Sequence, residues 1–447
     1  MVTGGNKIHI PSLLMPFIGI CFLLTGCSSP NRGLFAGKTA HERYADKISN
    51  AGLKETLIGQ SWFAASVKSL SQPLTIRLPY RETGYFEATQ PDAAGYRFSA
   101  KRGDKIFIQL HKKPVAGFSL FLDLWLPGNS TQPQLLAAAD TTNDSITYEI
   151  NKNGDYIIRL QPELLAGGEY TLEIRTGPSL QFPIAAAARP RISSFWGDAR
   201  DAGARSHEGV DIFSTFRTPL LAAADGQVTS VTQNNLGGKV IFLRPNGKDF
   251  VLYYAHLDSQ LVQQGQSVQA GDTIGLMGNT GNARNTPPHL HFGIYASGGA
   301  IDPLPFIETK HTEPASIQVP TSDLKTLRRS VRNAIIHIAP EKQAARLLTP
   351  PAGTLLQLRS ATGAWYKVKL PDGREGFVAG ESVNPISTPL RTYKTDSTQM
   401  LQDTPSPLAS TKALITANNT IRVLGIFENY HFVQAGDKQG WIKIANN

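Results

Sequence analysis

The chain has 447 residues, of which 41% are hydrophobic and 18% charged, a composition that excludes a disordered protein and a multi-span membrane protein. Its formal net charge is +9, but the basic residues are scattered, and their longest cluster runs from Lys325 to Arg332. This scatter argues against a nucleic-acid partner. Two interpretations of the charge stay open: weak attraction to an anionic surface, and simple solubility. The length predicts three or four domains.

The N-terminal segment has the layout of an export signal. Residues 11–26 form an apolar run, too short to span a bilayer, that follows a polar segment containing Lys7. The run ends in Leu24-Thr25-Gly26-Cys27, which resembles a bacterial lipobox. The resemblance implies that residues 1–26 are a lipoprotein signal peptide and that an acylated Cys27 anchors the exported protein to the membrane. A plain cleaved signal and a short membrane anchor are the alternatives.

Serine occupies the two positions after Cys27. By resemblance to the sorting patterns of Gram-negative lipoproteins, the absence of aspartate there favours the outer membrane. The only other cysteine, Cys21, lies inside the signal, so disulfides cannot hold the later domains together. Residues 27–69 are interpreted as a tether with a short helical element, because several apolar pairs in this stretch have i, i+4 spacing.

Residues 70–180 show short alternating strands that follow turn residues, a pattern that predicts a β-sandwich. Examples are Lys105–Leu110 after Gly103-Asp104, and Tyr156–Leu160 after Asn153-Gly154-Asp155. The closing strands resemble the pre-peptidase domains found beside secreted bacterial proteases. Because these residues contain no catalytic constellation, we interpret them as a spacer or a binding module.

The block from 185 to 308 contains four of the ten histidines of the chain. His207 and Asp211 are four residues apart. Gly209 and the β-branched residues beside it argue against a helix, and in a strand the even spacing also keeps both side chains on one face. Imidazole nitrogen and carboxylate oxygen both suit Zn²⁺.

His289 and His291 are two apart in a strand-like run, so both imidazoles are expected on one side, with Leu290 and Phe292 facing the core. His256 follows another strand-like stretch. Each motif alone is weak evidence for a metal site, because such short patterns are common by chance.

Taken in order, the motifs H-x-G-x-D, Y-x-H-L, G-N-T-G and P-H-L-H-F resemble those of the lysostaphin-type (LytM-like) zinc endopeptidases. The resemblance implies that residues 185–308 form an antiparallel β zinc endopeptidase domain. It implies one Zn²⁺ held by His207, Asp211 and His291, with His256 and His289 as catalytic residues. The implied partners are the stem peptides or cross-links of peptidoglycan. The loop between Gly278 and the P-H-L-H-F motif is longer than is usual in the family, which bears on substrate preference.

Glu208 is the obvious rival base, since it follows a ligand directly as in H-E-x-x-H enzymes. If Glu208 lies in a strand beside His207, its side chain points to the opposite face, and we reject it for that reason. Two other functions remain open: a catalytically silent member of the same fold that binds wall material or activates a hydrolase, and an adhesive lipoprotein. Neither alternative needs all five site residues.

Two similar units follow a linker rich in Thr, Pro and Ser. Residues 325–385 and 392–447 share the order strand, aromatic strand, polar turn and Gly-aromatic strand, which resembles a tandem pair of bacterial SH3-like domains. Such domains imply binding to wall peptide or glycan, and packing against the catalytic domain is the alternative. The expected fold is therefore multidomain and mainly β, with a sandwich before the LytM-type domain and two small SH3-like barrels after it. Oligomeric state cannot be predicted.

Overall fold

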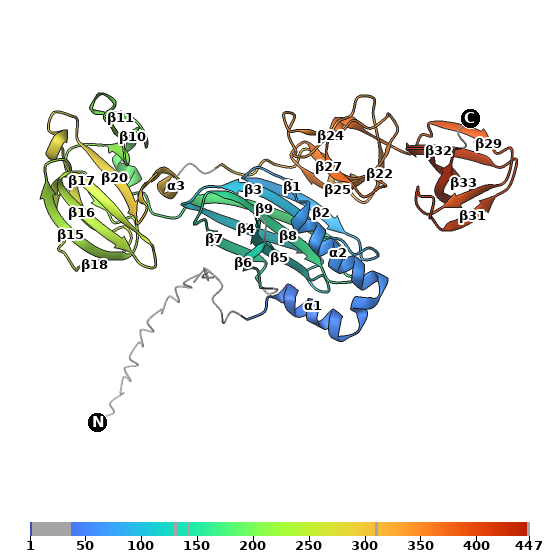
Figure 1. The fold of residues 1–447 in the computed structure, drawn as a ribbon, viewed down its shortest axis with the longest axis horizontal. Coiled ribbons are helices and arrows are strands. Elements are labelled where there is room, and N and C mark those ends of the chain that lie inside the picture. The colour runs from blue at the N-terminus through green and yellow to red at the C-terminus, as the bar shows by residue number, and fades with distance from the viewer. Residues whose placement is uncertain (2–36, 129–131, 141–142, 309–311, 445–447) are drawn as a thin grey trace.

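The computed structural model describes residues 1, 37–128, 132–140, 143–308 and 312–444, and the predicted multidomain, mainly β fold is confirmed. Figure 1 shows four β bodies in a row: a central domain (residues 180–307), a sandwich (74–178), a first C-terminal unit (327–385) and a second C-terminal unit (391–443). The central domain thus stands at one end, although it lies in the middle of the sequence. The predicted signal peptide and Cys27 lie outside the described residues. Among the described helices, none is both long and apolar enough to cross a bilayer.

Two helices and a short 3-10 turn precede the sandwich. They are α1 (Ala40–Asn50), η1 (Leu53–Glu55) and α2 (Leu57–Ser71). α1 begins with a capping box, in which Thr39 and Glu42 each accept a hydrogen bond from the other's backbone N–H. Trp62 of α2 is fully buried against the sandwich, and its indole N–H donates to the Pro162 carbonyl at 2.8 Å. This indole anchors the helical segment.

The sandwich consists of two antiparallel-dominated sheets over one core. The first sheet has the order β1 (Leu74–Thr75), β3 (Ala94–Ala100), β8 (Gly154–Pro162), β5 (Leu120–Leu126) and β6 (Gln134–Ala138). The second contains β2 (Tyr80–Phe86), β9 (Gly168–Pro178), β4 (Asp104–Lys113) and β7 (Ser145–Glu149). Alternating residues such as Ile106, Ile108 and Leu110 point into the shared core, as the period of two requires.

The second sheet does not end at β2. Thr83 and Gly84 of β2 pair with Ala361 and Ser360 of the first C-terminal unit, so one sheet runs through both bodies. The strands of this unit are β22 (Leu327–Ser330), β23 (Ile336–His337), β24 (Arg346–Leu348), β25 (Leu355–Thr362), β26 (Trp365–Lys369), β27 (Glu375–Ala379) and β28 (Val383–Pro385). The sequence interpretation did not anticipate this junction, because cross-strand pairing between distant segments leaves no periodic signal.

A buried acid lies at the junction. The Glu82 side chain is fully buried and accepts hydrogen bonds from the hydroxyls of Tyr80 at 2.7 Å, Tyr170 at 2.6 Å and Tyr96. From the C-terminal side, Ser360 donates to the same carboxylate at 3.0 Å, and the Lys367 ammonium lies 3.9 Å away. We call these six residues the Glu82 cluster. Because a buried charge is costly unless it is paired and hydrogen-bonded, the two bodies depend on each other here.

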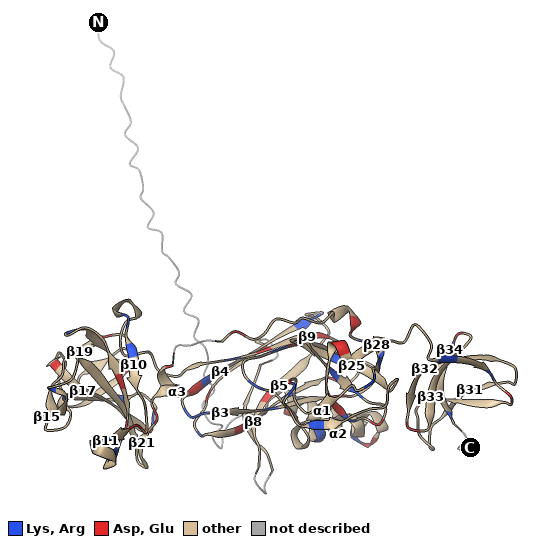
Figure 2. Ribbon diagram, turned by 90° about the horizontal axis from the view of Figure 1, so that it is seen from above, with Lys and Arg blue, Asp and Glu red and all other residues tan. Residues whose placement is uncertain are grey.

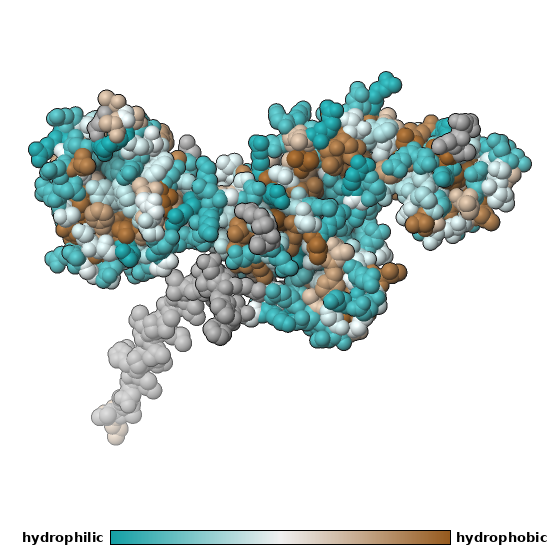
Figure 3. All heavy atoms as spheres, in the orientation of Figure 1, coloured by the Kyte–Doolittle hydropathy of each residue, from teal (hydrophilic) through white to brown (hydrophobic). Residues whose placement is uncertain are grey.

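The second C-terminal unit is a six-stranded sheet. Its strands are β29 (Arg391–Lys394), β30 (Gln399–Gln402), β31 (Thr411–Ile415), β32 (Thr420–Phe427), β33 (Tyr430–Ala435) and β34 (Lys438–Lys443). Its Phe427 and Trp441 belong to the same buried cluster as Leu355 of the first unit, so the two units share apolar packing. In Figure 3, brown side chains gather where the sandwich meets these units.

The central domain is built on an antiparallel sheet with the order β10 (Arg191–Ser194), β13 (Val210–Phe213), β20 (His289–Ala296), β17 (Phe250–Gln260), β16 (Gly238–Pro245), β15 (Gly226–Asn234) and β18 (Ser267–Val268). Off this path lie β14 (Pro219–Leu221), β19 (Thr273–Met277), β21 (Gly299–Ile301) and the hairpin of β11 (Ala199–Arg200) and β12 (Arg205–Ser206). The short helical segments of this domain are η2 (Ala186–Ala188), η3 (Asp201–Gly203), η4 (Gly281–Ala283) and α3 (Leu304–Ile307). Later in the chain, η5 (Thr321–Asp323) precedes the first C-terminal unit and η6 (Gly380–Ser382) lies within it.

The central domain also contacts the sandwich. Phe306 of α3 is buried and packs against the backbone of Gly103, and Arg102 forms an ion pair with Asp249 at 2.8 Å. Basic and acidic residues are interspersed along the ribbon (Figure 2), in keeping with the scatter of charge in the sequence.

Candidate metal centre and active site

Strand register brings two of the expected ligands together. In the antiparallel pair of β13 and β20, Asp211 lies directly opposite His291. Ile212 and Leu290 are fully buried in the core, so the alternation of side chains directs Asp211 and His291 to the other face of the sheet. The expectation that Leu290 and Phe292 face the core is confirmed by their zero exposure.

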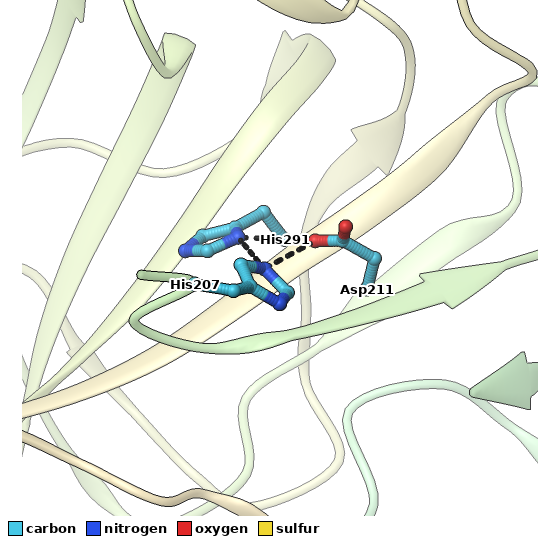
Figure 4. A group of neighbouring side chains, drawn as sticks. All are labelled: His207, Asp211 and His291. Atoms are coloured by element: carbon cyan, nitrogen blue, oxygen red, sulfur yellow. Dashed lines mark hydrogen bonds and ion pairs between the residues drawn. The ribbon is translucent and has the colours of Figure 1, made fainter. Parts of the chain in front are cut away.

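His207 reaches the same point from the turn before β13. Its backbone N–H donates to the Asp198 carbonyl at 2.8 Å, and its own carbonyl accepts from Gly197 at 2.9 Å. His207 Nε2, His291 Nδ1 and Asp211 Oδ1 form a triangle with all three sides 3.0 Å long (Figure 4). Within the described part of the chain, these three residues form the group that could hold a metal ion.

The hydrogen bonds of His207 show which atom is free to bind a cation. Nδ1 lies 2.8 Å from the Phe195 carbonyl oxygen, which can only accept, so Nδ1 carries the proton. In the neutral ring, Nε2 then presents a lone pair to the triangle. Two imidazole nitrogens and one carboxylate oxygen match the donor set of catalytic zinc sites, and a second hydrogen bond from each ligand histidine is typical of them. The residues therefore fit a zinc ion.

The charge states also suit a divalent cation. Burial raises the pKa of Asp211, but the close approach of the His207 and His291 rings outweighs this effect and holds the pKa well below the usual range. Burial lowers the pKa of His291, against the opposing effect of Asp211. At neutral pH the carboxylate is therefore ionised and the His291 ring neutral, as metal binding requires.

The second pair of histidines stands beside the triangle. His256 Nδ1 lies 2.9 Å from the Thr280 carbonyl, and His289 Nδ1 lies 2.9 Å from the Pro287 carbonyl. Both Nδ1 atoms are thus donors, and in a neutral ring with this tautomer Nε2 is the acceptor. The two ring centroids are 4.9 Å apart, and the His256 ring is 6.0 Å from the His291 ring.

His256 is held in an unusual conformation. Its φ is +65°, in the left-handed region that costs a residue with a Cβ about 1–3 kcal/mol. A backbone hydrogen bond of 2.7 Å to the Gly237 carbonyl fixes this bend within β17. Burial lowers the pKa of His256 to about 4, so the ring is neutral at pH 7. Such strain is typical of functional sites.

All five predicted residues line one pocket of about 520 Å³. Glu208 also lines this pocket, contrary to the expectation that it points away. Strand alternation does not apply to it, because His207 and Glu208 lie in the turn between β12 and β13. Glu208 is exposed, and burial together with this nearby carboxylate raises the pKa of Tyr295 to about 12.

Sequence reasoning missed Arg200. Its Nη2 donates to Asp211 Oδ2 and to Ser194 Oγ, both at 2.6 Å. Arg200 lies in a short hairpin outside every motif, and an arginine eleven residues before a ligand gives no periodic signal. Tyr253, whose ring stands 5.9 Å from the His291 ring, directly precedes the Y-x-H-L motif and was given no role.

Comparison with known proteins matches the part of the sequence that contains these five residues. Residues 205–303 match the model of peptidase family M23. The chain is 42% identical over 101 residues to an uncharacterized metalloprotease of Haemophilus influenzae, covering 22% of this chain and 21% of that protein. It is 35% identical over 138 residues to the L-Ala–D-Glu endopeptidase of Bacillus subtilis, covering 28% and 42% respectively.

Among solved structures, the catalytic domain of the antimicrobial peptidase lysostaphin from Staphylococcus simulans is 32% identical, with 27% of this chain and 94% of that chain covered and a TM-score of 0.25. The chain spans less than half the length of the two curated relatives. The family match lies in the central part of the sequence. On the sequence match, residues 205–303 form a domain of peptidase family M23.

Proposed function

We propose that the protein is a zinc-dependent endopeptidase that hydrolyses peptide cross-links of bacterial peptidoglycan. The observation that carries this proposal is the 3.0 Å triangle of His207 Nε2, His291 Nδ1 and Asp211 Oδ1, with a second histidine pair in the same pocket. A silent member of the fold would need neither a full ligand set nor the strained backbone of His256.

His207, Asp211 and His291 would hold the metal, and three protein ligands leave a position for water or substrate. When bound, zinc supplies a Lewis acid that polarises the scissile carbonyl and lowers the pKa of water. The protein holds the ligands in the necessary state, because the Phe195 carbonyl fixes the tautomer of His207 and the buried Asp211 stays ionised.

The second pair of histidines acts on the attacking water. With Nδ1 donating to a backbone carbonyl, Nε2 of His289 accepts the proton of the attacking water and later returns it to the leaving amine. Two roles are open to His256, a hydrogen bond to the developing oxyanion and a hydrogen bond to the attacking water, and its tautomer favours the second. A neutral ring whose Nδ1–H is already given to Thr280 accepts a hydrogen bond from water but cannot donate one to an oxyanion.

We propose the D-alanyl cross-link as the bond, because the predicted lipoprotein signal is of the Gram-negative kind. The relatives include a protein named for the L-Ala–D-Glu bond and a staphylococcal peptidase, so the assay must separate at least these chemistries. Cleavage of oligoglycine alone would rule out the D-alanyl assignment.

The test is release of muropeptides from purified peptidoglycan by residues 28–447. A His291→Ala variant and a chelator-treated sample remove the metal site, and His111→Ala, an exposed histidine of β4, is the matched control. We expect uncross-linked stems from the parent and from the control variant only, with one zinc bound per chain.

The possible outcomes separate the alternatives. Release that requires both zinc and His291 supports the endopeptidase, and mass spectrometry of the products identifies the bond. A protein that binds no zinc and releases nothing belongs instead to the wall-binding or hydrolase-activating alternative. Zinc binding without release from any wall type would show that the site is not a peptidoglycan endopeptidase.

We also propose that acylated Cys27 anchors the exported protein in the cell envelope, in the outer membrane if the envelope is Gram-negative. The C-terminal units are proposed to be SH3-like domains that bind wall peptide or glycan, and the sandwich a spacer or binding module. Cys27→Ser should move the protein from the membrane fraction to the soluble fraction, and retention in the membrane would contradict the anchor.

A further inference from the structure

Arg200 sits behind the proposed metal ligand. It ends β11, and its side chain is 32% exposed. One nitrogen, Nη2, donates both to Asp211 Oδ2 and to Ser194 Oγ at 2.6 Å. The other carboxylate oxygen, Oδ1, faces the two histidines at 3.0 Å each. The two oxygens of Asp211 therefore have different partners.

The surrounding hydrogen bonds fix this arrangement. Ser194 Oγ gives its proton to Asp198 Oδ2 at 2.9 Å, which leaves its lone pairs to accept from Arg200. Ser194 lies directly opposite Asp211 in the pairing of β10 with β13, so both acceptors of the guanidinium stand on neighbouring strands. Asp198 is held in turn by the backbone N–H of Phe195 at 2.7 Å.

The same turn also orients His207, through the carbonyl of Phe195. A carboxylate that is free at both oxygens can bind a metal through one oxygen or through two. Here Oδ2 is engaged by a cation, and a charge-assisted hydrogen bond of this kind is about twice as strong as a neutral one. Rotation of the carboxylate to present both oxygens would break it.

We propose that Arg200 is a positioning residue that keeps Asp211 a one-oxygen ligand of the metal. The inference rests on the proposed zinc site. By withholding Oδ2, Arg200 preserves the coordination position that water and the scissile carbonyl need. Without Arg200, the second oxygen of Asp211 competes for that position.

The test replaces zinc with cobalt(II), whose visible absorption reports coordination, since four-coordinate cobalt absorbs much more strongly than higher-coordinate cobalt. Arg200→Gln removes the cation, and Arg200→Lys keeps a cation that can reach only one acceptor well. Arg191→Gln, at an exposed arginine of β10, is the matched control. Zinc affinity is measured by competition with a chelator.

For Arg200→Gln we expect weaker cobalt absorption and a fall in kcat of about 10- to 100-fold, the range for loss of an outer-shell partner. We expect zinc affinity to change by much less than kcat, because the ligand gains an oxygen while the water position is lost. Arg200→Lys should recover part of both signals, and Arg191→Gln should match the parent. If Arg200→Gln does not fold, Ser194→Ala, which removes one acceptor of Arg200, should show a smaller change of the same kind.

An unchanged cobalt spectrum in a folded Arg200→Gln protein would overturn the inference. So would a loss of zinc affinity equal to the loss of activity, because Arg200 would then only stabilise the site. A parent protein that takes up neither zinc nor cobalt would instead refute the proposed function, and the two failures are thus distinguishable.

Discussion

His256 offers a sharp separation between binding the metal and using it. Replacing His256 by Asn removes the ring that we assign to the attacking water and leaves the ligand triangle intact. Asn is preferred to Ala because it tolerates the left-handed φ of +65° that this position adopts. The change therefore tests chemistry with little added backbone strain.

The expected loss follows from the geometry. The His256 ring is 6.0 Å from the His291 ring and makes its hydrogen bond to the Thr280 carbonyl, so zinc stoichiometry should stay at one. General acid–base groups contribute about 10²- to 10⁴-fold. Because His289 remains, we expect the lower end, about 100-fold in kcat/KM, or about 2.7 kcal/mol of transition-state stabilisation.

The assay pairs turnover of a purified cross-linked muropeptide with zinc analysis of the same samples. A His256→Asn protein that loses its zinc would show that His256 supports the metal rather than the reaction. A variant with full zinc and full activity would remove His256 from the mechanism altogether. His256→Ala should be less stable than His256→Asn if the positive φ is the source of strain.

Four further outcomes are expected. Asp211→Asn should lower zinc affinity by more than the about 10- to 100-fold that is typical for loss of a residue that only hydrogen-bonds a metal ligand. Competition with a chelator measures this affinity, and a value equal to that of the parent protein would exclude Asp211 as a ligand. Glu208→Gln should reduce kcat by far less than the about 100-fold expected for a lost general base, since Glu208 is exposed and lies near enough to Tyr295 to raise the pKa of that hydroxyl. A larger loss in turnover assays would show that Glu208 is the base. Glu82→Gln should lower the free energy of unfolding, measured in urea, by about 3 kcal/mol, because it breaks a buried charged network. A change under about 1 kcal/mol would contradict a charged Glu82 cluster. Burial lowers the pKa of His41 to about 4, below its unfolded value near 6.5. The stability that neutral His41 contributes is therefore full above pH 6.5 and is lost as the pH falls toward 4, by at most about 3 kcal/mol. His41→Gln should flatten the plot of unfolding free energy against pH between these values, and an unaltered plot would refute the assignment.

Most of the structure that could be predicted for the central domain came from the spacing of residues within single strands. The two-residue spacing of His289 and His291 indicated a strand with Leu290 inward, and the burial of Leu290 agrees. The alternation of side chains along a strand gave a wrong direction for Glu208, because the turn after β12 interrupts the strand at this position. Side-chain direction in a turn depends on backbone hydrogen bonds that have no spacing to read.

Contacts between distant segments of the chain could not be predicted from the sequence. Arg200 acts on Asp211 across a hairpin, and Ser360 meets Glu82 across 278 positions of sequence. Neither residue type is unusual by itself, and only the folded register shows that they are neighbours. Propensity and pattern describe elements one at a time, whereas these contacts arise from how the elements are paired.

The sheet that continues from β2 into β25 changes what truncation means for this protein. Cutting the chain after residue 312 would remove Ser360 and Lys367, leaving the Glu82 carboxylate with its tyrosines but without its cation. It would also uncover the edge of β2, a row of unpaired backbone groups that invites aggregation. Loss of the C-terminal part would therefore act like a substitution in a protein core. The family M23 domain is thus enclosed between two stretches of sequence that complete one another.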